Sequence, residues 1–375
     1  MSEHMHERPE PAHERDTFRK VLHVPVGYGH GEYDSALEQV QLDIFRAHGY
    51  DIVEDDPFDA DSPMEMGIGV QTNVRDGYER DQRIAYEAGV RMPESFDVRA
   101  MLEYPGAVIA KPYASDRGDL KYLLESPEQK RRFVAWFIAQ SNLDTLFKDG
   151  DIDDDLVQNL LTQVANGEVD QEKLEGWIFE EQIITPGTYN TSFRVVVDAF
   201  GRVHYSQVAR SAAPKGVDAD PSITHTTPLP RSMGDMWGAD TSILLAHPDS
   251  PFYIAPKHIT SNISTGGVRL RLNGVSAESP EDRTALQELG INPDEPRLPV
   301  ALHDTSSTIG RLSRGEYPFV GVDYLIDERT GEYVMLEINT GPHLDPQALG
   351  LAPDADETAC EIALLENMLA HSPLR

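Results

Sequence analysis

The sequence predicts a mixed α/β (α+β) fold that contains more than one domain. The chain has 375 residues, which exceeds one average domain, and 39% of them are hydrophobic, enough to bury substantial cores. Strand-like and helix-like segments alternate near the N-terminus, and pairs of strands joined by short turns follow later. This order indicates one alternating layer followed by antiparallel sheets.

The composition excludes several classes of partner. The chain carries 64 acidic and 32 basic residues, a formal net charge of −32. Nucleic acids and anionic membranes require a positive protein surface, so we expect neither as a partner. Abundant acidic residues with few Lys are typical of a high-salt cytoplasm, although a GC-rich genome and an ordinary acidic surface predict the same composition.

Cysteine content and hydropathy indicate the compartment. The single Cys360 excludes an internal disulfide, and we expect it to be a thiol of the protein core. No apolar run has the length of a membrane-spanning helix, and no signal-peptide pattern opens the sequence. These features predict a cytoplasmic protein.

The N-terminal part divides into a tail and a small alternating unit. Residues 1–18 are polar and are predicted to be a disordered tail. Residues 19–79 are predicted to form a Rossmann-like domain, with strands at 21–26 and 51–53 and a helix at 35–48 that ends at Gly49. The glycines between the first strand and the helix lack the dinucleotide-binding spacing, so this unit alone predicts no nucleotide site.

Residues 80–184 are predicted to form a second unit. A short buried strand at 107–112 contains Lys111 near its end and is followed by a polar loop that includes Gly118 and by an antiparallel return strand. A Lys and a loop of this kind could hold phosphates, although a Lys leaving a strand is commonly a surface residue. Residues 126–176 are predicted to be mostly helical, with an Asp-rich interruption at 149–155 that we interpret as a solvated helix start.

The strand at 177–184 delivers Glu180, Glu181 and Gln182 to one place. An exposed strand end is one reading of this pattern. The other interpretation is a segment that contacts the edge of a nucleotide base, mainly through its backbone groups.

Residues 185–375 are predicted to form the third unit. Strands at 192–199 and 203–210 form a hairpin whose Arg194 and Arg210 could face one concave surface and bind an anion, with a structural Arg pair as the alternative. Residues 211–260 are rich in Pro, Gly, Ser and Asp and are too long for a plain connection. We expect a lid-like insertion there.

A second hairpin in this unit, with strands at 319–326 and 333–338, carries the most specific pattern. It holds Asp323, Glu337 and Asn339, and residues 337 and 339 point to the same face. Carboxylate and amide groups inside apolar strands are unfavourable unless something compensates them. Mg²⁺ bound together with substrate phosphates would do so, because hard cations take oxygen ligands.

Taken in order, these motifs resemble the ATP-grasp superfamily. The matching residues are Lys111 with its strand, the segment 180–183, Arg194, and Asp323 with Leu336-Glu337-Ile338-Asn339, and the likeness covers roughly residues 80–342. Ser261-Asn262-Ile263-Ser264-Thr265-Gly266-Gly267 resembles a loop of the RimK-like glutamate ligases. The resemblance implies an ATP-grasp fold with an N-terminal Rossmann-like pre-ATP-grasp domain.

The resemblance also implies roles for individual residues. Lys111 and the loop with Gly118 would bind the ATP phosphates, and Glu180, Glu181, Gln182 and Ile183 would frame the adenine. Mg²⁺, with Mn²⁺ as an alternative, would be held by Asp323, Glu337 and Asn339. The transferring phosphoryl group would be stabilised by Arg210, Arg194 and Asn262.

The activity implied by the resemblance is an ADP-forming carboxylate–amine ligase. It would activate a small-molecule or peptide carboxylate as an acyl phosphate, which an amine or thiol captures. A phosphotransferase (kinase) and a nucleotide-binding module without turnover are the alternatives. A homodimer is the default assembly. The sequence departs from the family in its Gly-poor phosphate loop and in having Arg75 or Arg80 where a second Lys is common.

Overall fold

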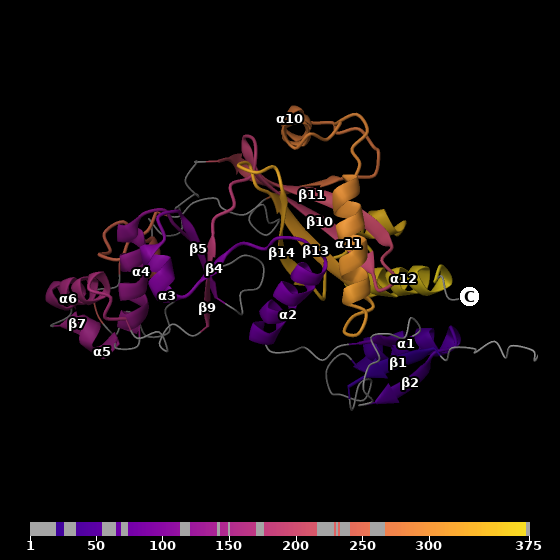
Figure 1. Cartoon of the computed structure of the whole chain (residues 1–375), viewed down its shortest axis with the longest axis horizontal. Coiled ribbons are helices and arrows are strands. Elements are labelled where there is room, and N and C mark those ends of the chain that lie inside the picture. Colours follow the sequence, from indigo (N-terminus) through magenta and orange to yellow (C-terminus); the bar gives the residue numbers. More distant parts are fainter. Residues whose placement is uncertain are drawn as a thin grey trace, which may run out of the picture.

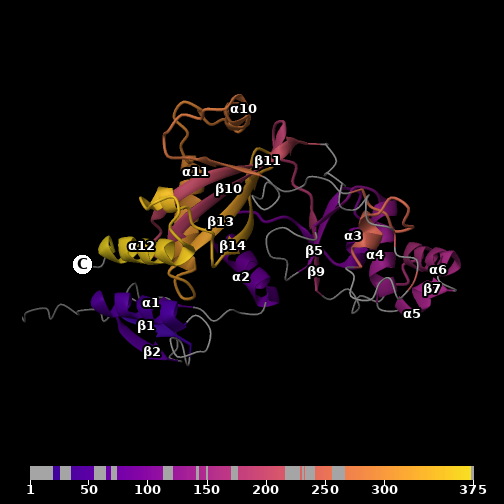
Figure 2. The ribbon, with the colours of Figure 1, turned by 180° about the vertical axis from the view of Figure 1, so that it is seen from behind.

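A computed structural model describes most of the chain, namely residues 20–25, 35–54, 65–68, 74–112, 121–140, 143–148, 151–169, 176–215, 229, 232, 241–255 and 267–372. Its described strands form three larger sheets and one short hairpin, and helices cover them (Figures 1 and 2). The predicted α/β (α+β) class is confirmed. The predicted tail and most of the predicted lid-like insertion lie outside the described residues.

The N-terminal unit is a parallel sheet with strand order β2-β1-β3. Its elements are β1 (Val21–Val24), α1 (Ser35–Ala47), β2 (Asp51–Glu54) and β3 (Glu65–Gly67). Gly49 ends α1 with a φ of 80°, as predicted. Parallel pairing is what a strand–helix–strand pattern predicts. The Rossmann-like assignment itself stays a prediction.

Helix α12 (Glu357–Ala370) joins this unit to the rest of the molecule. Leu365 and Met368 of α12 share a buried cluster with Leu22 of β1 and Phe45 of α1. Both ribbon views show α12 lying along α1 (Figures 1 and 2). The C-terminal helix therefore closes the core of the N-terminal sheet.

A small antiparallel sheet with strand order β4-β9-β5-β6 follows. Its strands are β4 (Ser95–Phe96), β9 (Trp177–Glu181), β5 (Val108–Pro112) and β6 (Tyr122–Leu124). It packs with α3 (Val98–Glu103), α4 (Pro127–Gln140), α5 (Leu143–Leu146), α6 (Asp154–Ala165) and a short hairpin, β7 (Phe147–Lys148) and β8 (Asp151–Ile152). The predicted Asp-rich helix start is confirmed, because the Asp153 side chain accepts from the Leu156 N–H and caps α6.

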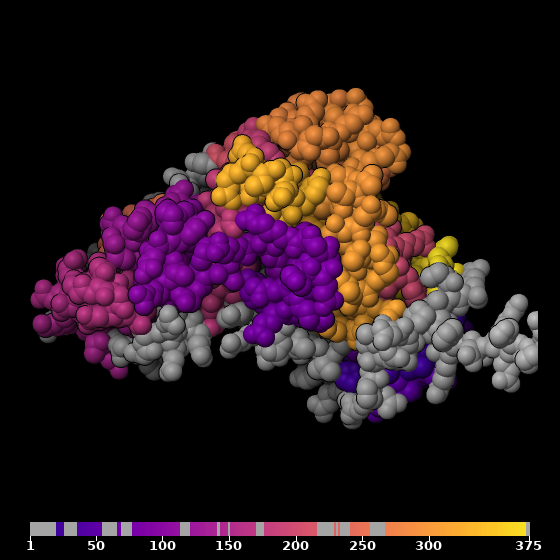
Figure 3. Space-filling model, viewed as in Figure 1, coloured from indigo at the N-terminus to yellow at the C-terminus, as the bar shows by residue number. Residues whose placement is uncertain are grey.

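The large antiparallel sheet has strand order β12-β11-β10-β13-β14. Its strands are β12 (Val268–Arg271), β11 (Val203–Pro214), β10 (Tyr189–Asp198), β13 (Phe319–Ile326) and β14 (Tyr333–Asn339). Both predicted hairpins are confirmed. One face packs against α2 (Val74–Glu87), α10 (Pro280–Glu288) and α11 (Val300–Leu312); the segment containing α10 projects from the surface (Figure 3).

The opposite face of the large sheet is only partly covered. Cys360 and Leu364 of α12 pack there on Val196 and Phe319, near the short 3-10 helix η3 (Pro346–Leu349). Cys360 is buried, as predicted for a core thiol. The remainder of this face is left for polar side chains.

Helix α2 begins at Val74, six residues before residue 80, where the second unit is predicted to start. The predicted boundary between residues 79 and 80 therefore falls inside α2. The helix packs on β14 and α11, because Ile84 and Ala85 are buried in the cluster beneath the large sheet. The domain limits 1–18, 19–79, 80–184 and 185–375 otherwise stay predictions.

The described part of the predicted lid-like insertion packs against the helices α3, α4, α5 and α6, which we call the helical lobe. Residues 211–214 continue β11, and residues 241–255 include α9 (Ile243–Ala246). Leu244 and Phe252 are buried in the core around α4, and Trp136 Nε1 donates to the Thr241 carbonyl at 3.1 Å. The chain thus returns from the large sheet to the helical lobe. No helix among the described residues has the length and apolarity needed to cross a membrane.

Candidate active site

A cleft lies between the small and large sheets, and we call it the inter-sheet cleft. The small sheet and its connections line it with Pro93, Ile109, Lys111, Lys121 and residues 180–183. The large sheet lines it with Asn190, Ser192, Asp323, Leu325, Leu336 and Glu337. Most of the predicted site residues therefore line one cavity, although they come from segments more than 200 residues apart.

Strands β13 and β14 bring three predicted ligands together. Asp323 and Glu337 are direct partners in the strand register. Asn339 Nδ2 donates to Asp323 Oδ2 at 3.0 Å and to Glu337 Oε1 at 3.3 Å. Gly321 is the strand partner of Asn339. A Cβ atom at residue 321 would lie 2.6 Å from Pro342 Cβ, which explains why this position of the strand is a glycine.

Arg194 is the cation of this group. Its Nε and Nη2 donate to Asp323 Oδ1 and Oδ2 at 2.7 and 2.6 Å, a bidentate pair between register partners on β10 and β13. Burial and the neighbouring Glu337 raise the pKa of Asp323 against the opposing charge of Arg194. Burial also acts to raise the pKa of Glu337, but Lys121 and Lys111 outweigh it and lower that pKa.

The residues present fit a Mg²⁺ that also binds phosphate. Asp323 and Glu337 supply hard oxygen donors, and a half-turn of the Asn339 amide would present its Oδ1 instead of Nδ2. Among the described residues, no three or more His, Cys, Asp or Glu side chains gather around a point where a metal could bind. Phosphate and water oxygens would have to complete the coordination, as is usual for Mg²⁺.

Lys111 reaches the cleft from the small sheet. Its Nζ lies 2.7 Å from Glu180 Oε2 and 5.9 Å from the centre of the Tyr78 ring. Burial acts to lower the pKa of Lys111, but the charges of Glu180 and Glu337 outweigh it and raise that pKa. Lys111 therefore stays charged and lies in the field of a large-sheet carboxylate.

The Glu181 side chain does not join Glu180, contrary to the expectation that strand β9 delivers both to one place. Adjacent strand residues point to opposite faces. Glu181 accepts from Arg91, from Arg329 Nη2 at 2.8 Å and from the Glu94 N–H at 3.2 Å. It belongs to a group that ties β9 to the β13–β14 turn, which we call the hinge ion-pair network: Arg91, Glu181, Asp327 and Arg329.

The backbone of residues 181–183 is also partly engaged. The N–H groups of Glu181 and Gln182 donate to the carbonyls of Glu94 and Ala107 at 2.8 and 3.0 Å. The N–H of Ile183 has no hydrogen-bond partner among the described residues. Within the described part of the protein, Ile183 thus offers an unengaged backbone donor at the wall of the cleft.

Arg210 does not share a face with Arg194, so that expectation is wrong. Arg194 opposes Gln207 in the register, and Arg210 is three residues further along β11, which turns its side chain to the other face. There Arg210 Nε donates to Asp282 Oδ1 at 2.7 Å, and its guanidinium lies 5.0 Å from the Tyr189 ring centre. Gly118 and Asn262 lie outside the described residues.

Two other charged residues define the surroundings of the cleft. Lys121, at the start of the return strand, lines the cleft and acts on Glu337. The sequence signal that could have identified Lys121 was its position at the start of the return strand, which pairs with the strand of Lys111. Arg80, a candidate for the second cation, is instead paired with Asp81 at 2.7 Å and Glu316 at 3.4 Å. It is therefore a structural residue.

Asp81 supports the strand that carries the candidate ligands. Its Oδ2 accepts from the buried Ile338 N–H at 2.9 Å, between Glu337 and Asn339. Burial raises the pKa of Asp81 to about 6, against the opposing charge of Arg80. Helix α2 is thus fixed to β14 at the candidate metal site.

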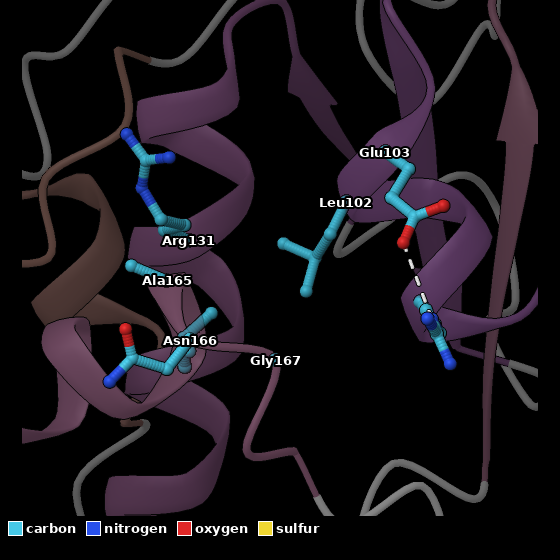
Figure 4. A pocket seen from close by; sticks show the side chains of 8 residues that line it. Leu102, Glu103, Arg131, Ala165, Asn166 and Gly167 are labelled. Carbon is cyan, nitrogen blue, oxygen red and sulfur yellow. Dashed lines mark hydrogen bonds and ion pairs between the residues drawn. The ribbon is translucent and has the colours of Figure 1, made fainter.

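A second hollow lies in the helical lobe, between α3, α4 and the end of α6 (Figure 4). Its charged side chains include an Arg99–Glu103 pair at 3.3 Å, with both side chains largely exposed. Exposed pairs of this spacing occur on many helix surfaces. We assign this second hollow no role in the chemistry.

Comparison with known proteins gave structural matches only. No family model and no curated protein matches the sequence. One solved structure that matches is D-alanine–D-alanine ligase from Bacillus anthracis complexed with ATP, with 11% identity, 94% of this chain and 98% of that chain covered, and a TM-score of 0.34. Another is the ATP-grasp ligase PsnB complexed with a minimal precursor, with 11% identity, 93% and 99% coverage, and a TM-score of 0.34.

A third match is phosphoribosylamine–glycine ligase from Thermotoga maritima, with 12% identity, 89% of this chain and 72% of that chain covered, and a TM-score of 0.32. Similarity at this level carries no argument about activity or substrate. The functional assignment therefore depends on the residues of the cleft, and the RimK-like resemblance stays a prediction.

Proposed function

We propose that this chain is an ATP- and Mg²⁺-dependent enzyme with an ATP-grasp core, which activates a carboxylate as an acyl phosphate for capture by an amine or thiol. One observation carries the proposal: two lysines from the small sheet and two carboxylates from the large sheet line the same cleft. Lys111 and Lys121 both act electrostatically on Glu337. Such an arrangement suits a ligand that carries both phosphates and a metal ion.

The nucleotide would bind with its phosphates near Lys111 and its base near Ile183. Lys111 is charged and positioned by Glu180, and ammonium groups bind phosphates as point charges. The N–H of Ile183, which has no partner among the described residues, is a donor suited to an acceptor nitrogen of the base. Apolar side chains of Ile109 and Leu336 also line the cleft and would contact the ring faces.

Asp323, Glu337 and Asn339 would hold Mg²⁺, which when bound neutralises phosphate charge. Arg194 fixes Asp323 through two hydrogen bonds, and this orients the carboxylate before any ligand arrives. Asp81 fixes the backbone between the other two ligands. The chain thus supplies a rigid set of oxygen donors on paired strands.

The reaction would proceed in two steps. A substrate carboxylate oxygen attacks the γ-phosphorus, and ADP leaves to give an acyl phosphate. An amine or thiol then attacks the acyl carbon, inorganic phosphate leaves, and the nucleophile loses a proton. Positioning and charge stabilisation would supply most of the rate enhancement, since no protein nucleophile is required.

The decisive experiment measures ADP and inorganic phosphate released by the protein with ATP, Mg²⁺ and high KCl. Pools of small carboxylates and amines are added separately and together. Release of both products that requires a carboxylate and an amine supports the proposal. ADP formed without free phosphate, together with a phosphorylated acceptor, would instead identify a kinase.

A matched pair of variants makes this test specific to the cleft. Glu337→Gln removes a charge from the candidate metal site, whereas Glu332→Gln removes one from the exposed turn of the same hairpin. We expect product release to disappear only in the first variant. ATP binding by the wild-type protein, with no product from any pool, would favour a nucleotide-binding module and contradict the proposal.

A further inference from the structure

Strand β12 is an edge strand of the large sheet, and one side of its backbone is unpaired among the described residues. The Leu272 N–H donates to the Ser206 carbonyl at 3.0 Å, so the alternation of an antiparallel ladder directs the backbone groups of Leu270 to β11 as well. The N–H and carbonyl groups of Arg269 and Arg271 therefore point away from β11. They have no other hydrogen-bond partner within the described part of the chain.

A hollow of about 520 Å³ adjoins this edge and reaches both faces of the sheet. Arg269, Arg271 and Asp345 line it on the partly covered face. Leu270 and Leu286 line it on the face that α10 covers, because successive strand residues point to opposite faces. A hollow of this shape suits an extended chain, whose alternate side chains also point to both faces.

The two arginines of the edge differ in their charge partners. Arg271 donates to Asp345 from Nε and Nη2 at 2.5 and 2.9 Å. Arg269 has no ion pair among the described residues, and its Nε is buried with no hydrogen-bond partner among them. Burial and the nearby charge of Arg194 lower the pKa of Arg269. A carboxylate next to Arg269 would therefore supply the acceptor and the negative charge that this guanidinium lacks in the described part of the protein.

The other wall of the hollow offers an apolar side chain. Val275 lies in the segment that joins β12 to α10, lines the hollow and is 66% exposed. Ala277 of the same segment packs on the buried cluster around Leu286, which places this segment on the α10 side of the hollow. An apolar side chain opposite Leu270 would point to that side and cover part of Val275.

We propose that the open edge of β12 is a docking site for an extended peptide segment that carries an acidic residue next to an apolar one. The peptide would add a strand to the large sheet through about four main-chain hydrogen bonds to Arg269 and Arg271. Its acidic side chain would pair with Arg269, and the adjacent apolar side chain would contact Val275. This inference does not depend on the proposed function, because docking requires neither ATP nor turnover.

A single peptide chain fits this edge better than a second copy of the protein. The segment that contains α10 follows β12 directly and projects from the surface (Figure 3). Residues of this segment bound the hollow on one side, and Asp345 bounds it on the other. The edge is therefore recessed, and the projecting segment would obstruct the approach of another sheet.

The test measures peptide binding to the wild-type protein in about 1 M KCl, where charges more than ~3 Å apart are largely screened. Under these conditions the net charge of −32 no longer repels an acidic peptide. The probes are fluorescein-labelled, C-terminally amidated peptides Ser-Thr-X-Val-Thr-Ser, in which X is Glu, Gln or Lys, and fluorescence anisotropy follows binding. For the Glu peptide we expect a dissociation constant of about 10–100 μM. The Gln peptide should bind about 3- to 10-fold more weakly, and the Lys peptide at least ~10-fold more weakly.

Methylated peptides test the main-chain pairing directly. If X lies opposite Arg269, its N–H donates to the Arg269 carbonyl, whereas the N–H of the following Val points away from β12. Methylation of the X amide should therefore weaken the Glu peptide at least ~10-fold. Methylation of the Val amide is the matched control and should change the affinity less than about threefold.

Protein variants assign the side-chain contacts. Arg269→Gln should bring the Glu and Gln peptides to within about twofold of each other, a loss of preference that general destabilisation would not produce. The matched control Arg297→Gln removes an exposed arginine beside the hollow, paired with Glu295 at 2.5 Å, and should keep the preference. Val275→Ser, at an exposed position, should weaken the Glu peptide about fivefold and leave a peptide with Ser in place of Val unchanged.

Three outcomes would show that the inference is wrong. In the first, no probe binds the wild-type protein at concentrations up to ~1 mM. In the second, the Glu and Lys peptides bind equally, or both methylated peptides lose affinity to the same extent. In the third, light scattering shows a wild-type dimer that Val275→Ser dissociates while no peptide binds, so that a second copy occupies the edge. Absence of ligase activity in the product-release assay would leave the docking site unaffected.

Discussion

Replacing Glu181 by Ala tests whether this residue belongs to the hinge ion-pair network or to the nucleotide site. The variant loses hydrogen bonds from Arg91, from Arg329 at 2.8 Å and from the Glu94 N–H at 3.2 Å. Hydrogen bonds to charged groups contribute about 1.5–3 kcal/mol each. Both arginines keep Asp327 as a partner and are 35% and 53% exposed, so water replaces part of the loss. We expect the free energy of unfolding to fall by about 2–4 kcal/mol.

Equilibrium urea denaturation, followed by tryptophan fluorescence, measures this free energy. Glu332→Ala, on the exposed turn of the neighbouring hairpin, is the stability control and should change the free energy by less than ~0.5 kcal/mol. Calorimetric titration with ATP is the second readout. The affinity of Glu181→Ala for ATP should stay within about threefold of the wild type, because its side chain points away from Lys111.

The opposite pattern would refute this reasoning. If Glu181→Ala unfolds at the same urea concentration as the wild type and loses ATP binding, the side chain acts on the nucleotide and the network is not a stabilising element. If Glu332→Ala is destabilised as strongly as Glu181→Ala, the effect is not specific to the network.

Three further predictions concern single side chains. Glu337→Gln should lower the rate of ADP release at saturating Mg²⁺ by about 1,000-fold or more with unchanged circular dichroism, and near-normal turnover would remove Glu337 from the metal site. Lys111→Ala should raise the dissociation constant for ATP about 10- to 100-fold in a calorimetric titration, and an unchanged constant would exclude Lys111 from phosphate binding. Lys130, 1% exposed, donates to the Tyr104 and Gly106 carbonyls at 2.5 and 2.8 Å. Lys130→Met should therefore lower the free energy of unfolding by about 2–4 kcal/mol in urea titrations, and a loss below ~0.5 kcal/mol would show that these carbonyls need no donor.

The sequence by itself determined the features that depend on local patterns. Period-two alternation and the turn residues predicted both hairpins of the large sheet. The group of Asp323, Glu337 and Asn339 was also predictable, because two carboxylates and an amide within otherwise apolar strands stand out by residue type alone.

The tertiary structure decided which groups meet across long distances in the sequence. The β10–β11 register separates Arg194 from Arg210, and a change of one residue in that register would reverse the result. The direction of Glu181 follows from its partners Arg91 and Arg329, which are 90 and 148 residues away.

Of the two arginines on β12, only Arg271 has an ion pair among the described residues, and this difference was likewise invisible in the sequence, where Arg269 looks equivalent. Only the packing of Asp345 against one of the two makes them different. Local periodicity fixes which face a side chain occupies within its own strand, whereas its partner depends on strand register and on contacts between distant segments.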